Sequence, residues 1–143
     1  MGTGVAGACL LAWLTALSVF DIRERRLPNW LTLPGAVVVL GVAAAAGRGV
    51  PAVLGAVGLT GLYLVVHLVA PAAMGAGDVK LAVGVGALTG AFGYDVWVLA
   101  AVGAPLLTAT WALVALSRRS SSTVPHGPSM CIATLAASAL AML

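Results

Sequence analysis

Apolar runs long enough to cross a lipid bilayer follow one another along almost the whole chain. Of its 143 residues, 62% are hydrophobic and only 8% are charged, whereas about a quarter of the residues in a soluble domain are charged. Each transmembrane helix needs about 20 apolar residues, which leaves room for about six crossings joined by short connections. We therefore predict an all-α, polytopic membrane protein in which residues 1–143 form a single membrane-embedded domain.

Glycine, proline and polar residues divide the sequence into six apolar runs. The first five cover about residues 5–20, 31–46, 52–69, 79–92 and 96–116, and the sixth reaches residue 143. Closely spaced glycines stand in the third and fourth runs, namely Gly55, Gly58, Gly61, Gly84, Gly86 and Gly90. Because small residues let helix backbones approach each other within a membrane, we expect these two segments to pack tightly. Pro28 is expected in the first turn of the second helix, where proline is tolerated.

The basic residues gather after alternate apolar runs. Six of the seven lie in or beside the connections that follow the first, third and fifth runs, namely Arg23, Arg25, Arg26, Lys80, Arg118 and Arg119. The exception is Arg48, after the second run. Cytoplasmic loops are enriched in Lys and Arg, so we expect these three connections, including residues 120–122, in the cytoplasm and both termini outside. Since the basic cluster follows the first run instead of preceding it, that run is expected to be a retained helix and not a signal peptide.

The net charge of +3 is explained by this topology and does not indicate a nucleic-acid partner. A nucleic-acid groove would need a basic stripe interleaved with aromatic residues, which the sequence lacks. The lipid bilayer is the expected surrounding.

Two acidic residues stand at the ends of apolar runs on the predicted cytoplasmic face. Asp21 ends the first run, and Asp78 ends the connection between the third and fourth runs. An acid at the edge of the hydrocarbon is costly unless it is paired, hydrated or neutralised. Two facing acids can share one proton, because both cannot ionise at a separation of about 3 Å. The charged acid could then activate a water as general base, while the protonated acid hydrogen-bonds a carbonyl oxygen.

Each acid also has a simpler interpretation, as a helix cap or as the partner of a nearby arginine. Asp21, which precedes an arginine cluster, fits this interpretation by itself. Asp78 fits it less well, because Gly75 and Gly77 are a costly choice before a simple cap. Glycine allows unusual φ and ψ angles and a close approach of another backbone, so we expect these glycines to admit a substrate strand.

Three stretches resemble the motifs of prepilin peptidases. Gly75-Ala76-Gly77-Asp78 matches the GxGD signature of membrane aspartyl proteases, and with Lys80 and Leu81 it resembles the second catalytic motif of that family. Asp21, followed by arginines and by Leu27-Pro28-Asn29, resembles the first motif. Pro125-His126-Gly127-Pro128 resembles a Pro-x-Gly-Pro feature ahead of the last helix. The resemblance extends over essentially the whole chain.

The resemblance implies an aspartic endopeptidase of the bacterial inner membrane. Its substrates would be type IV pilin-like precursors, from which it removes a basic leader at the cytoplasmic face. Asp21 and Asp78 would form the catalytic dyad. The further motif and substrate-binding positions would be Gly75, Gly77, Lys80, Pro28 and Asn29. No metal or other cofactor is expected, since the sequence contains neither Cys-x-x-Cys nor His-x-x-x-His.

Long members of the family carry a cytoplasmic insertion with paired Cys-x-x-Cys motifs, which is linked to methylation of the new amino terminus. Here only a short, cysteine-free stretch separates Asp21 from Pro28. We therefore expect cleavage without methyl transfer, as in the short peptidases of tight-adherence pilus systems, which the chain resembles in size.

Other polar residues have simpler expected roles. Lys80 is expected to extend to the lipid headgroups, and Glu24 to pair within the arginine cluster. His67 is expected to be a packed, hydrogen-bonded residue, and Asp95 to lie on the outer face, too far away to join the two acids. His126 stands where the family pattern suggests an aromatic residue, and the sequence assigns it no role.

Two other classes of protein remain open at this point. Intramembrane acids also mark proton relays in transporters, although a small proton-coupled transporter would place its acids near the bilayer midplane in related halves. The third possibility is a non-enzymatic assembly subunit held together by its glycine faces, which would tolerate loss of either acid.

Overall fold

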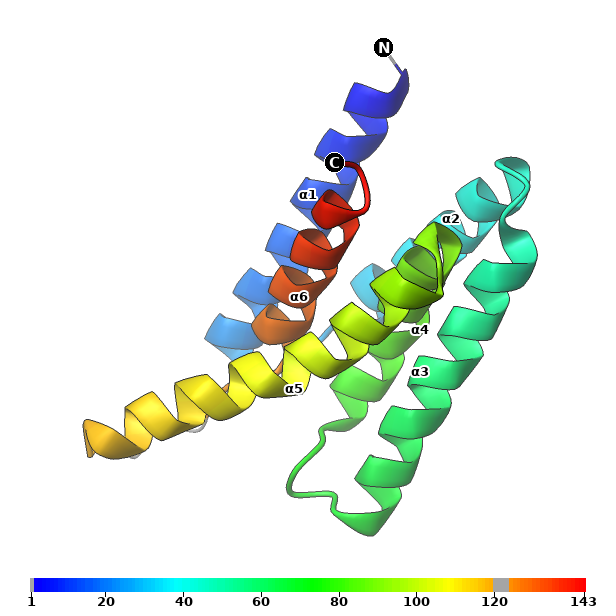
Figure 1. The fold of residues 1–143 in the computed structure, drawn as a ribbon. Coiled ribbons are helices and arrows are strands. Elements are labelled where there is room, and N and C mark those ends of the chain that lie inside the picture. The colour runs from blue at the N-terminus through cyan, green and yellow to red at the C-terminus, as the bar shows by residue number, and fades with distance from the viewer. Residues whose placement is uncertain (1, 120–123) are drawn as a thin grey trace.

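The computed structural model describes residues 2–119 and 124–143, and these residues form six α-helices and no strand (Figure 1). The helices are α1 (Gly2–Glu24), α2 (Asn29–Ala45), α3 (Gly49–Val69), α4 (Ala76–Phe92), α5 (Tyr94–Ser117) and α6 (Gly127–Leu140). Three of them, α1, α3 and α5, are long and apolar enough to cross a membrane. The predicted all-α class with six helices is confirmed, and the composition of the helices supports a membrane protein. Residues 120–122, predicted to be cytoplasmic, lie outside the described residues.

Polar residues continue several helices beyond the apolar runs. Helix α1 passes through Asp21 and ends at Glu24, and α4 begins at Ala76, so that Asp78 lies in its first turn and not in the connection before it. The prediction that Pro28 occupies the first turn of α2 is wrong, because this residue precedes the helix. Its backbone is extended (φ −69°, ψ 137°), and its carbonyl accepts hydrogen bonds from the N–H groups of the helix start, which is the usual geometry of an N-cap position.

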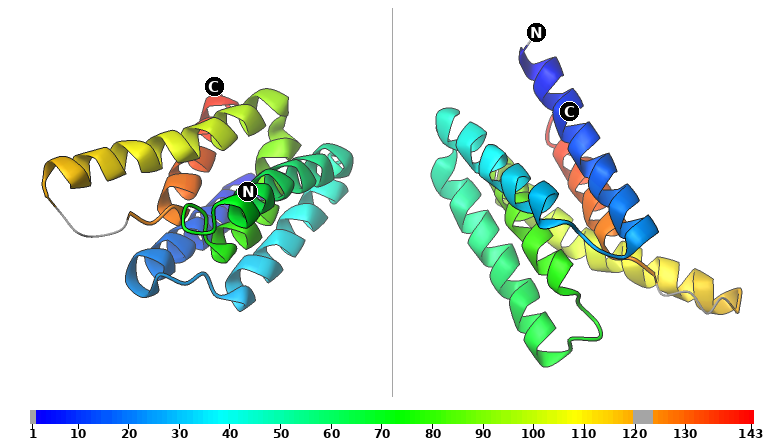
Figure 2. Two further views of the ribbon diagram at one scale, coloured as in Figure 1. Left: turned by 90° about the horizontal axis from the view of Figure 1, so that it is seen from below. Right: turned by 180° about the vertical axis from the view of Figure 1, so that it is seen from behind.

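The helices form two groups that α5 connects. Helices α1 and α6 lie side by side, and α2, α3 and α4 form the second group (Figures 1 and 2). The first half of α5 packs along α6, whereas its second half extends away from the other helices (Figure 1). The amino and carboxyl termini lie at the same end of the molecule (Figure 1). Helix α4 contacts α2, α3, α5 and α6 and is therefore central to the packing.

Glycines bring the backbones of α3 and α4 into direct contact. A Cβ atom on Gly86 would lie 2.5 Å from the carbonyl oxygen of Gly55, and one on Gly90 would lie 2.5 Å from the carbonyl oxygen of Pro51. Since no real Cβ atom approaches an oxygen so closely, the crossing requires glycine at both positions. The predicted tight packing is confirmed here, although Gly61 takes no part in it, because a Cβ there would meet no atom within 4 Å.

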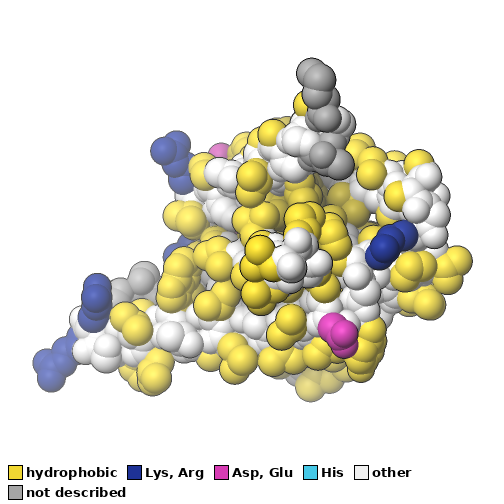
Figure 3. Space-filling view, turned by 45° about the horizontal axis from the view of Figure 1, so that its top comes forward, with side chains coloured by type: hydrophobic (Ala, Val, Ile, Leu, Met, Phe, Trp, Pro, Cys, Tyr) yellow, Lys and Arg dark blue, Asp and Glu magenta, His cyan; other side chains and the backbone are white. Residues whose placement is uncertain are grey.

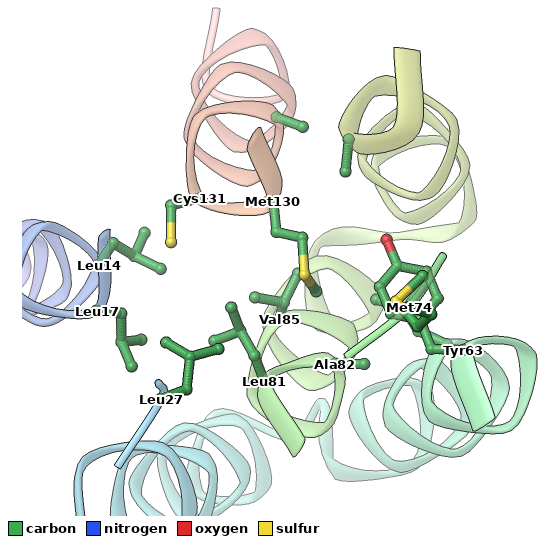
Figure 4. Close-up of a cluster of buried hydrophobic side chains, with 13 residues drawn as sticks. Leu14, Leu17, Leu27, Tyr63, Met74, Leu81, Ala82, Val85, Met130 and Cys131 are labelled. Atoms are coloured by element: carbon green, nitrogen blue, oxygen red, sulfur yellow. The ribbon is translucent and has the colours of Figure 1, made fainter. Parts of the chain in front are cut away.

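A buried apolar cluster joins the two groups of helices beside the end that carries Asp21 and Asp78. Figure 4 shows its side chains converging from α1, α4 and α6, with Leu27 and Tyr63 at its edges. Its most buried large members are Leu14, Leu17, Leu59, Leu81, Val85 and Met130. Because all of these residues except Leu59, which lies on α3, belong to the helices that carry the two acids and Gly127, the cluster fixes the positions of those helices relative to one another.

Apolar side chains also cover the outside of the molecule. Figure 3 shows hydrophobic groups over most of one face, with a few charged groups scattered among them. The most exposed large apolar side chains on the helices include Val37, Val50, Leu68, Val69, Leu113 and Leu116. In water such a surface would be costly, but in a bilayer it faces lipid of similar polarity.

Candidate active site

Asp21 lies in the last turns of α1 with only 9% of its surface exposed. Its Oδ2 atom accepts a hydrogen bond of 2.9 Å from the backbone N–H of Gly127, at the start of α6. The positive charge of Arg25, one turn further along, also acts on this carboxylate. The amino end of a helix and an arginine both favour a negative charge. An arginine therefore acts on Asp21, as the sequence suggested, and the carboxylate also receives a contact from a distant helix that the sequence could not show.

Gly127 has no room for a side chain. A Cβ atom there would lie 2.5 Å from Oδ2 of Asp21 and 3.0 Å from its Cγ. This lack of space explains why the third family-like stretch has glycine at position 127, since any other residue would push α6 away from the carboxylate. Sequence reasoning found this stretch by resemblance alone and did not predict its contact with Asp21.

Asp78 occupies the first turn of α4 and lies near enough to Asp21 for the two carboxyl groups to interact electrostatically. Its carboxylate also accepts a hydrogen bond from the backbone of Gly75, the N-cap residue of α4. This contact from the third helical residue back to the cap is half of a capping box. The interpretation of Asp78 as a helix cap is thus correct, but it describes only one of the interactions of this carboxylate. The same carboxylate is also one of two interacting acids at one end of the bundle.

The glycines before Asp78 act differently from our expectation. Gly75 has φ −74°, and positive φ angles occur, among the described glycines, only at Gly47 and Gly93. The predicted unusual backbone conformation is therefore wrong for both Gly75 and Gly77. A Cβ on Gly77 would lie 3.3 Å from the Cβ of Leu27, so this glycine lets the start of α4 pack against the connection that follows Asp21.

Lys80 and Asn29 join the two family-like motifs directly. The Lys80 ammonium donates a hydrogen bond of 2.8 Å to Oδ1 of Asn29, the first residue of α2. The sequence predicts that Lys80 extends to lipid headgroups, but in the structure its ammonium group has a partner within the protein. Asn29 therefore joins the start of α2 to the first turns of α4, two positions after Asp78.

Two histidines hold the connections around the site. The Nδ1 atom of His67, on α3, is 2.6 Å from the carbonyl oxygen of Met74 and donates its proton there, which ties the connection before α4 to α3. The predicted packed and hydrogen-bonded role of His67 is confirmed. His126 caps α6 and lies between Tyr63 of α3, 3.2 Å away, and Thr108 of α5, 2.6 Å away. Burial lowers the pKa of His126 below its ordinary value.

Tyr63 is a site residue that sequence reasoning missed. It is 4% exposed, and the charge of Asp78 acts on its hydroxyl group. A single tyrosine within an apolar run looks like a core residue, and only the fold brings its hydroxyl close to an acid.

Asp95, by contrast, follows the far end of α4, about 20 Å along the helix axis from Asp78. It does not join the two acids, as predicted.

The apolar helices indicate a membrane protein. The two interacting acids at one end of these helices form a candidate active site based on acid residues. Residues 8–143 match the family model described as the type IV leader peptidase family. Because this match covers nearly the whole sequence, the chain belongs to the type IV leader peptidase family. No curated protein and no solved structure matches it. The resemblance stated from the sequence is confirmed, and the protein is a peptidase-family member whose expected substrates are proteins.

Proposed function

We propose that this chain is an aspartic endopeptidase of the bacterial inner membrane that removes the basic leader of type IV pilin-like precursors. The observation that supports the proposal is the electrostatic interaction between Asp21, from the end of α1, and Asp78, from the start of α4. These two acids come from the two stretches that resemble the catalytic motifs of the family. The start of α6 lies at the same place, since Gly127 donates its N–H to Asp21.

The reaction needs one ionised and one protonated carboxyl group. The ionised acid takes a proton from a water molecule, whose oxygen attacks the carbonyl carbon of the scissile peptide bond. The protonated acid donates a hydrogen bond to the carbonyl oxygen and stabilises the negative charge that develops there. As the tetrahedral intermediate collapses, the amine leaves with a proton from the dyad, and the two carboxyl groups again share one proton.

The position of the dyad at one end of the bundle suits a precursor whose apolar helix stays in the membrane. With the positive-inside orientation, this end faces the cytoplasm, where the leader lies. The short connection between α1 and α2 leaves no place for a methylation-linked insertion, so the proposed activity is cleavage without methyl transfer.

The test is co-expression of the chain with a candidate pilin-like precursor. The chain has three aspartates, Asp21, Asp78 and Asp95, and the third serves as a matched control. Asp21→Asn and Asp78→Asn should each abolish the mobility shift of the processed product, whereas Asp95→Asn should retain it. Near-normal processing by either of the first two variants would exclude the dyad. Mass spectrometry of the product should show an unmethylated amino terminus.

A further inference from the structure

The side chain of His126 joins three helices at the point where α6 begins. Its Nε2 atom lies 3.2 Å from the hydroxyl oxygen of Tyr63 on α3, and its Nδ1 atom lies 2.6 Å from the hydroxyl oxygen of Thr108 on α5. Because a hydroxyl group can donate or accept a hydrogen bond, both contacts can form in either neutral tautomer of the ring. The start of α6 is therefore attached to α3 and to α5 through one imidazole.

His126 occupies the N-cap position of α6, but its side chain does not cap the helix. An N-cap side chain usually accepts a hydrogen bond from a backbone N–H of the first turn, whereas that of His126 makes no such bond to α6, all of whose residues the structure describes. The N–H of Gly127, the first residue of the helix, donates instead to Asp21 of α1 at 2.9 Å. Pro128, the next residue, has no N–H. Asp21 thus takes the place of a capping side chain from another helix.

The peptide unit between His126 and Gly127 is hydrogen-bonded at both ends. Its N–H donates to Asp21, and its carbonyl oxygen accepts the N–H of Met130 at 3.0 Å. The peptide unit is planar, so the direction of its N–H follows from the positions of the His126 Cα and of the first turn of α6. A displacement of His126 would therefore displace the hydrogen-bond donor of Asp21.

The contact between Gly127 and Asp21 allows little displacement in either direction. Closer approach is limited, since even a Cβ on Gly127 would lie 2.5 Å from Oδ2 of Asp21. Separation by a few tenths of an ångström takes the bond to the end of the usual range for N–H···O bonds, about 3.2 Å. The start of α6 must therefore be held in place, and the two contacts of His126 are suited to hold it.

We propose that His126 is a positioning residue for Asp21. Its contacts with Tyr63 and Thr108 hold the start of α6 where the N–H of Gly127 binds the Asp21 carboxylate, and this bond orients the carboxylate for the reaction. The consequence for cleavage rests on the proposed function. The effect on the Gly127 N–H does not, because it is a property of the folded chain without substrate.

The Gly127 amide can be observed selectively by NMR of the full chain in detergent micelles. The sequence contains a single His–Gly pair, at positions 126 and 127. Labelling histidine with carbon-13 at its carbonyl carbon and glycine with nitrogen-15 therefore gives one carbon–nitrogen correlated signal. An Asp21→Ala variant, which removes the hydrogen-bond acceptor, shows where this signal lies without the bond.

Variants of the two partners of His126 retain the His–Gly pair and hence the same labelling. Tyr63→Phe and Thr108→Val each remove one contact, and the double variant removes both. In the double variant the amide proton of Gly127 should shift towards its position in Asp21→Ala and should exchange with water about tenfold faster. Each single variant should give an intermediate change. An unchanged shift and exchange rate in all three variants would overturn the proposal.

Matched controls remove the same chemical groups elsewhere. Tyr94 is the second tyrosine of the chain, and the hydroxyl of Thr110, on α5, donates to Leu106 of its own helix. Tyr94→Phe and Thr110→Val should leave the Gly127 signal unchanged, and a response as large as that of the double variant would overturn the proposal. The amide of Ile132 reports on α6 beyond its first turn. Equal acceleration of exchange at Gly127 and Ile132 in the double variant would indicate general loosening of the helix and would also overturn the proposal.

Replacement of His126 tests the imidazole directly. Phenylalanine supplies a ring of similar size without nitrogen atoms. Labelling of phenylalanine and glycine in His126→Phe reports Gly127 together with Gly93, which follows Phe92 and gives its signal in the unmodified chain as well. The Gly127 amide should exchange at least as fast in His126→Phe as in the double variant. Exchange at the rate of the unmodified protein would refute the positioning role.

Cleavage of a precursor peptide supplies the functional measurement. The double variant of Tyr63 and Thr108 should lower kcat by about tenfold or more with little change in KM, because the substrate still binds but meets a misplaced acid. Tyr94→Phe and Thr110→Val should retain kcat. An unchanged kcat in the double variant would overturn the role in catalysis. If the unmodified chain cleaves no precursor while the Gly127 amide responds as expected, the proposed function fails and the positioning of the Gly127 N–H by His126 stands.

Discussion

The backbone N–H of Gly127 donates a 2.9 Å hydrogen bond to Oδ2 of Asp21, although 106 positions separate the two residues in the chain. The bond joins the last turns of α1 to the first turn of α6. It brings the Pro-x-Gly-Pro stretch to the first of the two acids, so that all three family-like stretches meet at one end of the bundle. Its geometry leads to a first prediction.

Gly127→Ala should nearly abolish cleavage while the protein remains inserted in the membrane. The new Cβ would lie 2.5 Å from Oδ2 of Asp21, so α6 or the carboxylate must move by about 1 Å, which can cost about 100-fold in rate. Gly61→Ala is the matched control, because a Cβ there meets nothing within 4 Å. Processing of a co-expressed precursor measures both variants. Equal processing by the two would contradict the role given to Gly127.

Gly77→Val should also impair cleavage, although both carboxyl groups remain. A Cβ at position 77 would lie 3.3 Å from Leu27 Cβ, and the two additional methyl groups of valine enlarge the clash. The start of α4, with Asp78, would therefore shift away from the connection after α1. The loss should be partly reversed by Leu27→Ala, which removes the opposing side chain. A Gly77→Val/Leu27→Ala variant no more active than Gly77→Val would indicate a role for Gly77 in contacting substrate instead.

The sequence was sufficient to predict the helices and the two acids, because both depend on local composition. Long apolar runs and their alternating basic connections indicate a bundle of helices, and an acid at the end of such a run is conspicuous. The tight crossing of α3 and α4 was also predictable, since Gly86 and Gly90 stand at a spacing typical of helix contacts.

Contacts between distant segments could not be predicted in the same way. Nothing near Tyr63 in the sequence indicates an acid, and nothing near Lys80 indicates Asn29, with which it bonds across 51 positions. The role of Gly77 was misjudged for the same reason. Glycine has two properties, freedom of the backbone and absence of a side chain, and only the position of Leu27 shows that the second one matters here.

Substitution at the α3–α4 crossing should reduce stability before it affects chemistry. Gly86→Val would direct its side chain into the backbone of Gly55, where even a Cβ would lie 2.5 Å from the carbonyl oxygen. Overpacking of this kind costs about 1–3 kcal/mol, so the midpoint of thermal denaturation in detergent should fall. Gly41→Ala, with no atom within 4 Å of the added Cβ, should leave it unchanged. A Gly86→Val protein as stable as the unmodified chain would contradict the close approach of the two helices.

The contribution of His126 to the stability of the fold should decrease as the pH falls below the ordinary pKa of histidine, about 6.5. Burial lowers the pKa of His126 in the folded chain, so between the two pKa values the unfolded chain binds more protons than the folded one. The stabilising contribution of neutral His126 therefore rises with pH in this range and is lost on acidification. Because glutamine does not titrate, a His126→Gln variant should lose less stability than the unmodified protein between pH 7 and pH 5. Thermal denaturation across that range measures the difference, and parallel curves for the two proteins would show that His126 does not titrate with folding.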